Sequence, residues 1–150
     1  MKKILFFILV ALLPQLANAQ DYYFIEYDGI YYNLYLDGYT AEIVGDHISG
    51  ELFLMDETIY YNGDNFTVTS VGNNAFEDCT ELTYVQLPST VTTIGDNAFK
   101  GCYNLSSFPI PSNLAYLGES AFEGCSNASG LTLPGTLKSI GSSAFADCTG

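Results

Sequence analysis

The sequence predicts a β-rich solenoid, a stack of 23-residue units with a parallel sheet and short helical turns, preceded by an antiparallel β cap. The first observation behind this prediction is a phrase that recurs at a constant spacing. Its copies are VGNNAFEDC at 71–79, IGDNAFKGC at 94–102, LGESAFEGC at 117–125 and IGSSAFADC at 140–148. The second is that fixed positions of the unit hold only apolar residues, and the third is that each complete unit closes with a proline. A short unit cannot bury its apolar face alone, so a repeat of this period is typical of a solenoid.

The units follow one another without a gap. Three complete units occupy 67–89, 90–112 and 113–135, and a truncated fourth occupies 136–150. The apolar columns are Val68/Val91/Leu114/Leu137, Val71/Ile94/Leu117/Ile140, Ala75/Ala98/Ala121/Ala144, Phe76/Phe99/Phe122/Phe145, Val85/Phe108/Leu131 and Leu87/Ile110/Leu133. Equivalent residues of stacked units lie over one another at the spacing of adjacent strands, about 4.8 Å. We therefore expect one continuous core with the four phenylalanines in a single interior row.

Within each unit, the local pattern predicts one strand and one turn. The stretch LTYVQLP at 82–88 alternates in its second half, as a strand with one buried face does. Proline then ends the strand, because it has no N–H to donate to a ladder. Glycine and a capping-type residue precede each Ala-Phe pair, which predicts a short helical turn. The outward positions of these strands form a candidate binding face, consisting of Tyr84, Gln86, Ser107, Pro109, Gly130 and Thr132.

Residues 1–19 have the pattern of a signal peptide. Lys2 and Lys3 precede an apolar run at 4–13, and Ala17 and Ala19 supply the small residues that a signal peptidase reads. This run is shorter than the roughly twenty residues that span a bilayer, which argues against the alternative of a membrane anchor. We expect cleavage after Ala19 and export of the mature chain, without membrane insertion, to the medium or the cell surface.

Residues 20–66 do not follow the repeat and contain nine of the twelve tyrosines. Short alternating runs, YYFIEY, IYYNLYL and YTAEIV, are separated by Asp-Gly pairs that favour tight turns. The segment is therefore expected to be a β-meander that caps the first unit, as solenoids require. The alternative is that its tyrosines form a platform for a sugar or a protein.

The charge of the chain excludes several classes of partner. The net charge is −13, and loss of Lys2 and Lys3 leaves two lysines against 17 acidic residues, or 2 − 17 = −15, with no arginine. Such a chain cannot form the basic surface that binds nucleic acid or anionic lipid. The acidity suits a solvated extracellular surface or a basic protein partner.

The four cysteines share one position of the unit, as Cys79, Cys102, Cys125 and Cys148. Parallel Cβ vectors in successive turns are unfavourable for disulfides, so buried free thiols are expected although an exported chain permits disulfides. A straight line of sulfurs also does not make the tetrahedron of a zinc site.

The sequence carries no recognisable catalytic, cofactor or metal motif. His47 is the single histidine and lies in a loop-like stretch, GDHISG. A loop histidine alone does not make a catalytic triad, and no nucleophile elbow accompanies it. The column Asn73/Asp96/Glu119/Ser142 mixes residue types, so a calcium ladder is only a weak alternative. We expect no enzyme activity, no cofactor and no metal.

The repeated columns resemble the BspA-type leucine-rich-repeat family, whose units carry I-G-x-x-A-F-x-x-C followed by L-x-x-I-x-I-P. The resemblance covers 67–150. It implies a leucine-rich-repeat-like stack and a secreted or surface protein that binds or adheres to proteins, host matrix proteins among them. Two departures are that Ala128 replaces the leucine of the strand and that the fourth unit stops before its strand.

Four functions follow from these observations. The leading one is a non-enzymatic extracellular protein that binds a protein ligand through the candidate face, although that face is small and mixed in character and also suits plain contact with water. The second is a structural role, as a repeat fragment or cap of a longer surface protein. In either that protein or an end-to-end pair of two copies, the sheet edge and apolar columns of the uncapped last turn would be covered. The third is a glycan-binding module that uses the tyrosines, and the fourth, an enzyme, has no supporting motif.

Overall fold

The computed structural model describes residues 22–45, 50–53 and 56–150, and these residues contain strands and turns but no helix. The signal peptide expected at 1–19 and His47 lie outside the described residues. The strands are β1 (Tyr22–Tyr27), β2 (Ile30–Tyr35), β3 (Thr40–Gly45), β4 (Gly50–Phe53), β5 (Thr58–Tyr61), β6 (Asp64–Val71), β7 (Leu82–Gln86), β8 (Thr93–Ile94), β9 (Tyr116–Leu117) and β10 (Ser139–Ile140).

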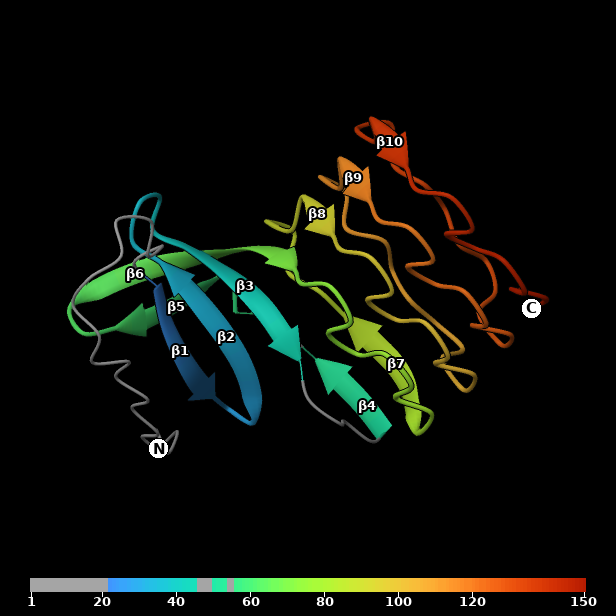
Figure 1. Cartoon of the computed structure of the whole chain (residues 1–150), viewed down its shortest axis with the longest axis horizontal. Coiled ribbons are helices and arrows are strands. Elements are labelled where there is room, and N and C mark those ends of the chain that lie inside the picture. Colours follow the sequence, from blue (N-terminus) through green and yellow to red (C-terminus); the bar gives the residue numbers. More distant parts are fainter. Residues whose placement is uncertain (1–21, 46–49, 54–55) are drawn as a thin grey trace, which may run out of the picture.

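The chain winds as a solenoid whose turns stack from the N-terminal strands to β10 at the opposite end (Figure 1). One sheet of eight strands runs the whole length in the order β1-β2-β3-β6-β8-β9-β10, and β5 pairs with β6 beside it. Strands β6, β8, β9 and β10 are parallel, and Val71, Ile94, Leu117 and Ile140 are register partners in turn. The predicted 23-residue register and the solenoid fold are confirmed.

The cap is antiparallel, and it joins the solenoid through β3. Strands β1, β2 and β3 form a meander, with tight turns in which Asp28 and Tyr39 adopt positive φ angles of 54° and 49°. Strand β3 then pairs parallel with β6, and β4 pairs parallel with β7. Strands β3 and β4, which precede the recognisable repeats, are therefore already parallel to the strands of the first unit.

The main ladder between units lies in a different segment from the expected one. Only the first unit forms a strand at the predicted place, β7, and the next unit contributes a single bridge between Tyr84 and Ser107. Pro109 removes a donor from the second unit, and Gly130 takes a φ of 66° in the third, so neither segment sustains a ladder. The continuous sheet instead uses the residues just before each glycine, such as Ser70 and Val71.

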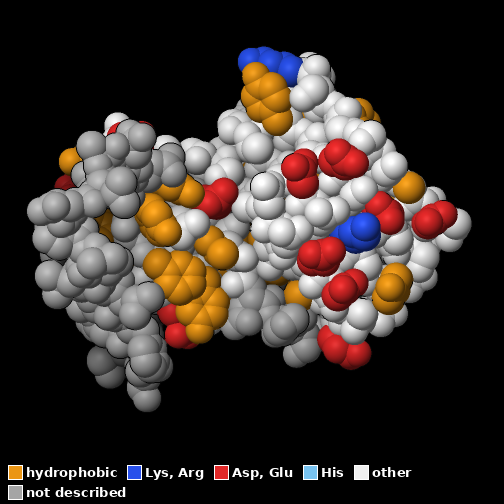
Figure 2. Space-filling model, viewed as in Figure 1, with side chains coloured by type: hydrophobic (Ala, Val, Ile, Leu, Met, Phe, Trp, Pro, Cys, Tyr) orange, Lys and Arg blue, Asp and Glu red, His pale blue; other side chains and the backbone are white. Residues whose placement is uncertain are grey.

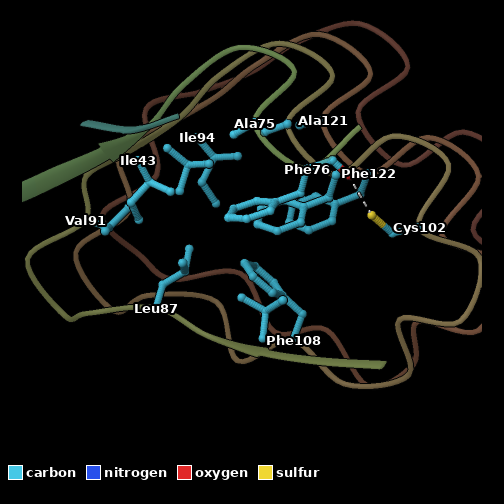
Figure 3. Close-up of a cluster of buried hydrophobic side chains, with 14 of the residues drawn as sticks. Ile43, Ala75, Phe76, Leu87, Val91, Ile94, Cys102, Phe108, Ala121 and Phe122 are labelled. Atoms are coloured by element: carbon cyan, nitrogen blue, oxygen red, sulfur yellow. Dashed lines mark hydrogen bonds between the residues drawn. The ribbon is translucent and has the colours of Figure 1, made fainter. Parts of the chain in front are cut away.

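The core contains the predicted phenylalanine row. Phe76, Phe99 and Phe122 are fully buried and stack face to face, with ring centroids 5.1 Å and 5.2 Å apart, and Phe145 continues the row at 5.6 Å. Figure 3 shows the rings of Phe76 and Phe122 piled inside the stack, with Phe108 on the opposite wall. The Phe108 ring lies 5.0 Å from Phe99 and 4.8 Å from Phe122, so it binds two successive turns together.

The expected helical turn is a hydrogen-bonded turn instead. In the first unit, the N–H of Ala75 donates to the oxygen of Gly72 and that of Glu77 donates to Asn74, three residues back in each case. Two positions of the unit have positive φ, which stops an α-helix from starting. The first is Asn74, Asn97, Ser120 and Ser143, and the second is Asp78, Gly101, Gly124 and Asp147.

Candidate functional site

The candidate face predicted from the sequence is only partly built as a sheet. Tyr84 and Ser107 are bridge partners, so these two residues lie side by side as expected. The Tyr84 hydroxyl donates a hydrogen bond of 2.7 Å to Oε1 of Gln86, and both side chains are half-buried. Pro109, Gly130 and Thr132 are exposed but lie outside any strand. We call this surface, consisting of Tyr84, Gln86, Ser107, Pro109, Gly130 and Thr132, the β7 face.

A second outward surface lies on the eight-stranded sheet, where the sequence interpretation did not expect a strand. Its column from successive turns consists of Ser70, Thr93, Tyr116 and Ser139, which are register partners in order. Lys138 places its ammonium group 5.6 Å from the centre of the Tyr116 ring, a cation–π distance. A signal for this strand was present in the sequence: β-branched residues, which favour strands, precede the glycine of the unit, as in TVTTI at 90–94.

Along this ladder the side chains do not alternate regularly between the two faces of the sheet, because a bulge recurs in successive turns. The N–H groups of Ala115 and Tyr116 both donate to the oxygen of Thr92, and those of Lys138 and Ser139 both donate to Ala115. Two residues of one turn therefore oppose one residue of the turn before, as in a β-bulge. In β6 the spacing of buried apolar side chains therefore changes from two residues, between Phe66 and Val68, to three residues, between Val68 and Val71.

The glycine column holds neighbouring turns at close approach. A Cβ added to Gly118 would lie 2.5 Å from the nitrogen of Asp96, and one added to Gly141 would lie 2.5 Å from the carbonyl carbon of Gly118. These glycines do not have positive φ, so conformational freedom is not the reason for them. Any larger residue would force two turns apart.

The mixed polar column performs a structural task, which the sequence interpretation did not find. Oδ1 of Asn73 accepts a 2.8 Å hydrogen bond from the backbone N–H of Asp96, and Oδ1 of Asp96 accepts one of 2.8 Å from the N–H of Glu119. Asn and Asp are equivalent for this purpose, because each offers a side-chain oxygen at the same position. The column therefore ties successive turns together through hydrogen bonds.

All four cysteines lie in the described part of the chain and are thiols, not disulfides. Each of the later three donates its S–H to a phenylalanine oxygen one turn back: Cys102 to Phe76, Cys125 to Phe99 and Cys148 to Phe122. Figure 3 shows the first of these bonds. Burial raises the pKa of the Cys125 thiol to about 12, and it raises the pKa of Cys102 as well. These two thiols are therefore protonated core groups at neutral pH and poor nucleophiles.

Among the described residues, no group of three or more His, Cys, Asp or Glu side chains is arranged to hold a metal ion. Within the same part of the chain, no helix is long and apolar enough to cross a membrane. What the described residues offer is extended outward surface on two sheets.

A parallel stack with a 23-residue register, an internal phenylalanine row and short turns defines a leucine-rich-repeat protein. The sequence model of the BspA type leucine rich repeat region, in six copies, matches residues 53–150, and the chain belongs to this family. The match begins upstream of residue 67, near β4. No curated protein matches the chain.

Solved structures of leucine-rich-repeat proteins are similar to this one. A protein from Bacteroides ovatus is 32% identical with a TM-score of 0.69, over 79% of this chain and 31% of its own length. A cell surface protein from Faecalibacterium prausnitzii is 23% identical with a TM-score of 0.69, over 83% of this chain and 40% of its own length. A protein from Bacteroides capillosus is 26% identical with a TM-score of 0.67, over 78% of this chain and 86% of its own length. The chain thus spans less than half the length of the first two. The family is a repeat scaffold, consistent with a protein-interaction module.

Proposed function

We propose that this protein is a non-enzymatic interaction module, exported by residues 1–19, that binds a protein ligand at the bacterial surface or in the medium. The observation that carries the proposal is the constant register of the repeat. On the outward surface this register sets Tyr84 beside Ser107 of the next turn. Repeat proteins use such extended surfaces to bind partners.

The β7 face is the proposed contact surface. Its exposed members are Ser107, Pro109, Gly130 and Thr132, while Tyr84 and Gln86 are held to each other. A tyrosine whose hydroxyl is already bonded can offer its ring at small entropic cost, as in many protein interfaces.

The ligand is proposed to be a basic protein, and host matrix proteins are the first candidates. Figure 2 shows acidic side chains spread over the turns of the repeat region on the visible face. The described residues include two lysines, Lys100 and Lys138, and the ammonium group of Lys100 is paired with Glu123 at 3.3 Å. Acidic groups on this scale accelerate association with a basic partner and make it sensitive to salt.

The test is binding to immobilised fibronectin, laminin and collagen by biolayer interferometry. The double variant Tyr84→Ala/Gln86→Ala is expected to weaken binding about tenfold, as loss of an aromatic anchor does. Tyr103→Ala, an exposed tyrosine outside the β7 face, is the matched control and should bind like the wild type. Equal binding by the double variant would remove the β7 face from the proposal, and no binding to any of the three proteins would remove matrix adhesion.

A further inference from the structure

The outward face of the cap combines aromatic rings and hydrogen-bonding groups in a fixed arrangement. The register places Tyr22 opposite Tyr35, Phe24 opposite Asn33 and Glu26 opposite Tyr31, and it places Glu42 opposite Asn33. Because side chains alternate along a strand, all of these residues point to the same side of the sheet. We call this surface the cap face; its residues are Tyr22, Phe24, Glu26, Tyr31, Asn33, Tyr35 and Glu42.

The cap face is not needed to close the core. The opposite side of the same strands supplies the side chains that cover the first turn, among them Leu34, Ala41 and Ile43, which are fully buried. By contrast, Tyr22 is 51% exposed and Phe24 is 45% exposed. Capping therefore accounts for one side of the meander and leaves the other side unexplained.

The rings of the cap face are ordered in two pairs, each joining an exposed ring of β1 to a half-buried tyrosine of β2. The rings of Phe24 and Tyr31 stack with centroids 5.3 Å apart and planes within 4° of parallel. The rings of Tyr22 and Tyr35 lie 5.8 Å apart with planes tilted by 42°. Figure 2 shows hydrophobic side chains gathered where β1, β2 and β3 lie in Figure 1. Rings fixed by each other lose little entropy when a ligand covers them.

A carboxylate is held in position beside these rings. Oε2 of Glu42 accepts hydrogen bonds from the Asn33 amide at 3.0 Å and from the Tyr35 hydroxyl at 2.8 Å. Burial, and then the bond to Glu42, raises the pKa of Tyr35 to about 12, so the hydroxyl keeps its proton at neutral pH. A carboxylate has about four acceptor sites, and these two donors use two of them.

We propose that the cap face binds a neutral carbohydrate chain. Aromatic rings can cover the apolar C–H faces of sugar rings, and the Glu42 carboxylate with the Asn33 amide can exchange hydrogen bonds with hydroxyl groups. The charges on this face, Glu26 and Glu42, are both negative, and residues 22–45 contain no lysine or arginine. Anionic glycans would be repelled, which selects neutral chains.

A carbohydrate suits this surface better than a basic protein does. The face is the side of a sheet and is dominated by rings, and Glu42 already accepts bonds from two neutral donors. An extended polysaccharide can lie along several rings of such a sheet without needing a closed pocket. The site is separate from the β7 face, whose strand residues Tyr84 and Gln86 lie in the β4–β7 sheet, whereas the cap face lies on the eight-stranded sheet.

The experiment is affinity gel electrophoresis of the purified protein in native gels with hydroxyethylcellulose, galactomannan or soluble starch, and with polygalacturonate as the anionic probe. At least one neutral polysaccharide should retard the protein, and Tyr22→Ala/Phe24→Ala should weaken the binding about tenfold or more. Glu42→Gln should weaken it about threefold or more, since charge-assisted acceptors are the stronger ones. Tyr103→Ala is the control, because its side chain has the same 51% exposure as Tyr22 but lies outside the cap.

Several outcomes would overturn the proposal. These are no retardation by any neutral polysaccharide, retardation by polygalacturonate alone, or equal retardation of the double variant and the control. Loss of matrix-protein binding by the double variant, without retardation of the wild type in any gel, would assign the face to a protein. If the double variant lacks the wild-type circular dichroism spectrum, Tyr22→Ala alone decides. Variants of the β7 face test the proposed protein binding separately.

Discussion

The rings of Phe99 and Phe122 are stacked with centroids 5.2 Å apart and planes 5° from parallel, although they belong to successive units of the repeat. The same relation holds for each neighbouring pair in the row. An aromatic ring in this row therefore contacts the turn before it and the turn after it. Stability of the solenoid depends on these contacts between turns more than on any contact within a unit.

The first prediction concerns the position of a phenylalanine in the row. Phe122→Ala should lower the free energy of unfolding by about 3–5 kcal/mol, because it opens a cavity between two turns and removes contacts with Phe99 and Phe108. Phe145→Ala should cost clearly less, since that ring is only partly buried and ends the described row. Urea unfolding followed by circular dichroism measures both, and equal losses would contradict stacking as the cause.

The register and the core were predictable because they depend on repetition alone. Once Phe76 and Phe99 occupy the same position in successive units, any parallel stack places them together, and the same holds for Cys79 and Cys102. The antiparallel cap followed from Asp-Gly turns between alternating runs.

The location of the main ladder was not predictable from periodicity. The bulge at Thr92 and its equivalents places two residues between buried positions, so the segment lacks the period of two by which a half-buried strand is recognised. The predicted strand at 105–111 has the expected apolar pattern, yet Pro109 and its missing N–H prevent a ladder there. In this unit the apolar pattern therefore predicts a strand, whereas the hydrogen-bonding capacity of the backbone does not allow one.

The surfaces were the least predictable part. The sequence identifies which residues alternate, but the ring pairs of the cap face depend on which residues of β1 and β2 are opposite each other. That register is set by the turn at Asp28, whose φ of 54° cannot be read from composition. The Asn73 and Asp96 bonds were missed because residues that differ in charge share one acceptor oxygen.

The second prediction concerns close approach at the glycine column. Gly118→Ala should destabilise the protein by about 1–3 kcal/mol or more, because the new Cβ would lie against the backbone of Gly95 and Asp96. Gly135→Ala is the control, since a Cβ there meets nothing within 4 Å and φ is not positive. Thermal unfolding should show a lower Tm for the first variant and little change for the second. A similar Tm for both variants would show that neighbouring turns can separate without cost.

The third prediction concerns the polar column. Asp96→Ala should cost about 1 kcal/mol, because the N–H of Glu119 loses its acceptor. Asp96→Asn keeps Oδ1 in place and should be nearly neutral. Added EDTA should leave the Tm of the wild type unchanged, as expected for a hydrogen-bonding role. A lower Tm of the wild type in EDTA, or a clear loss of stability in the Asp96→Asn variant without EDTA, would instead indicate a bound cation.

The last prediction concerns alkaline pH. The pKa of Cys125 is raised from 9.0 to about 12 in the folded protein, so above pH 9 the unfolded chain loses a proton that the folded chain keeps. Stability from this thiol is therefore fully present below pH 9 and is lost as pH rises towards 12, by about 1.4 kcal/mol per pH unit. Cys125→Ala should lower stability at pH 8 but reduce the steepness of its decline between pH 9 and 10. Tyr32 and Tyr35, whose pKa values are also raised on folding, contribute equally to that decline in the wild type and the variant. Urea unfolding at each pH measures the slope, with Cys148→Ala, a more exposed thiol, as the control that should change it less. An unchanged slope in Cys125→Ala would mean that the folded protein releases this proton as readily as the unfolded chain.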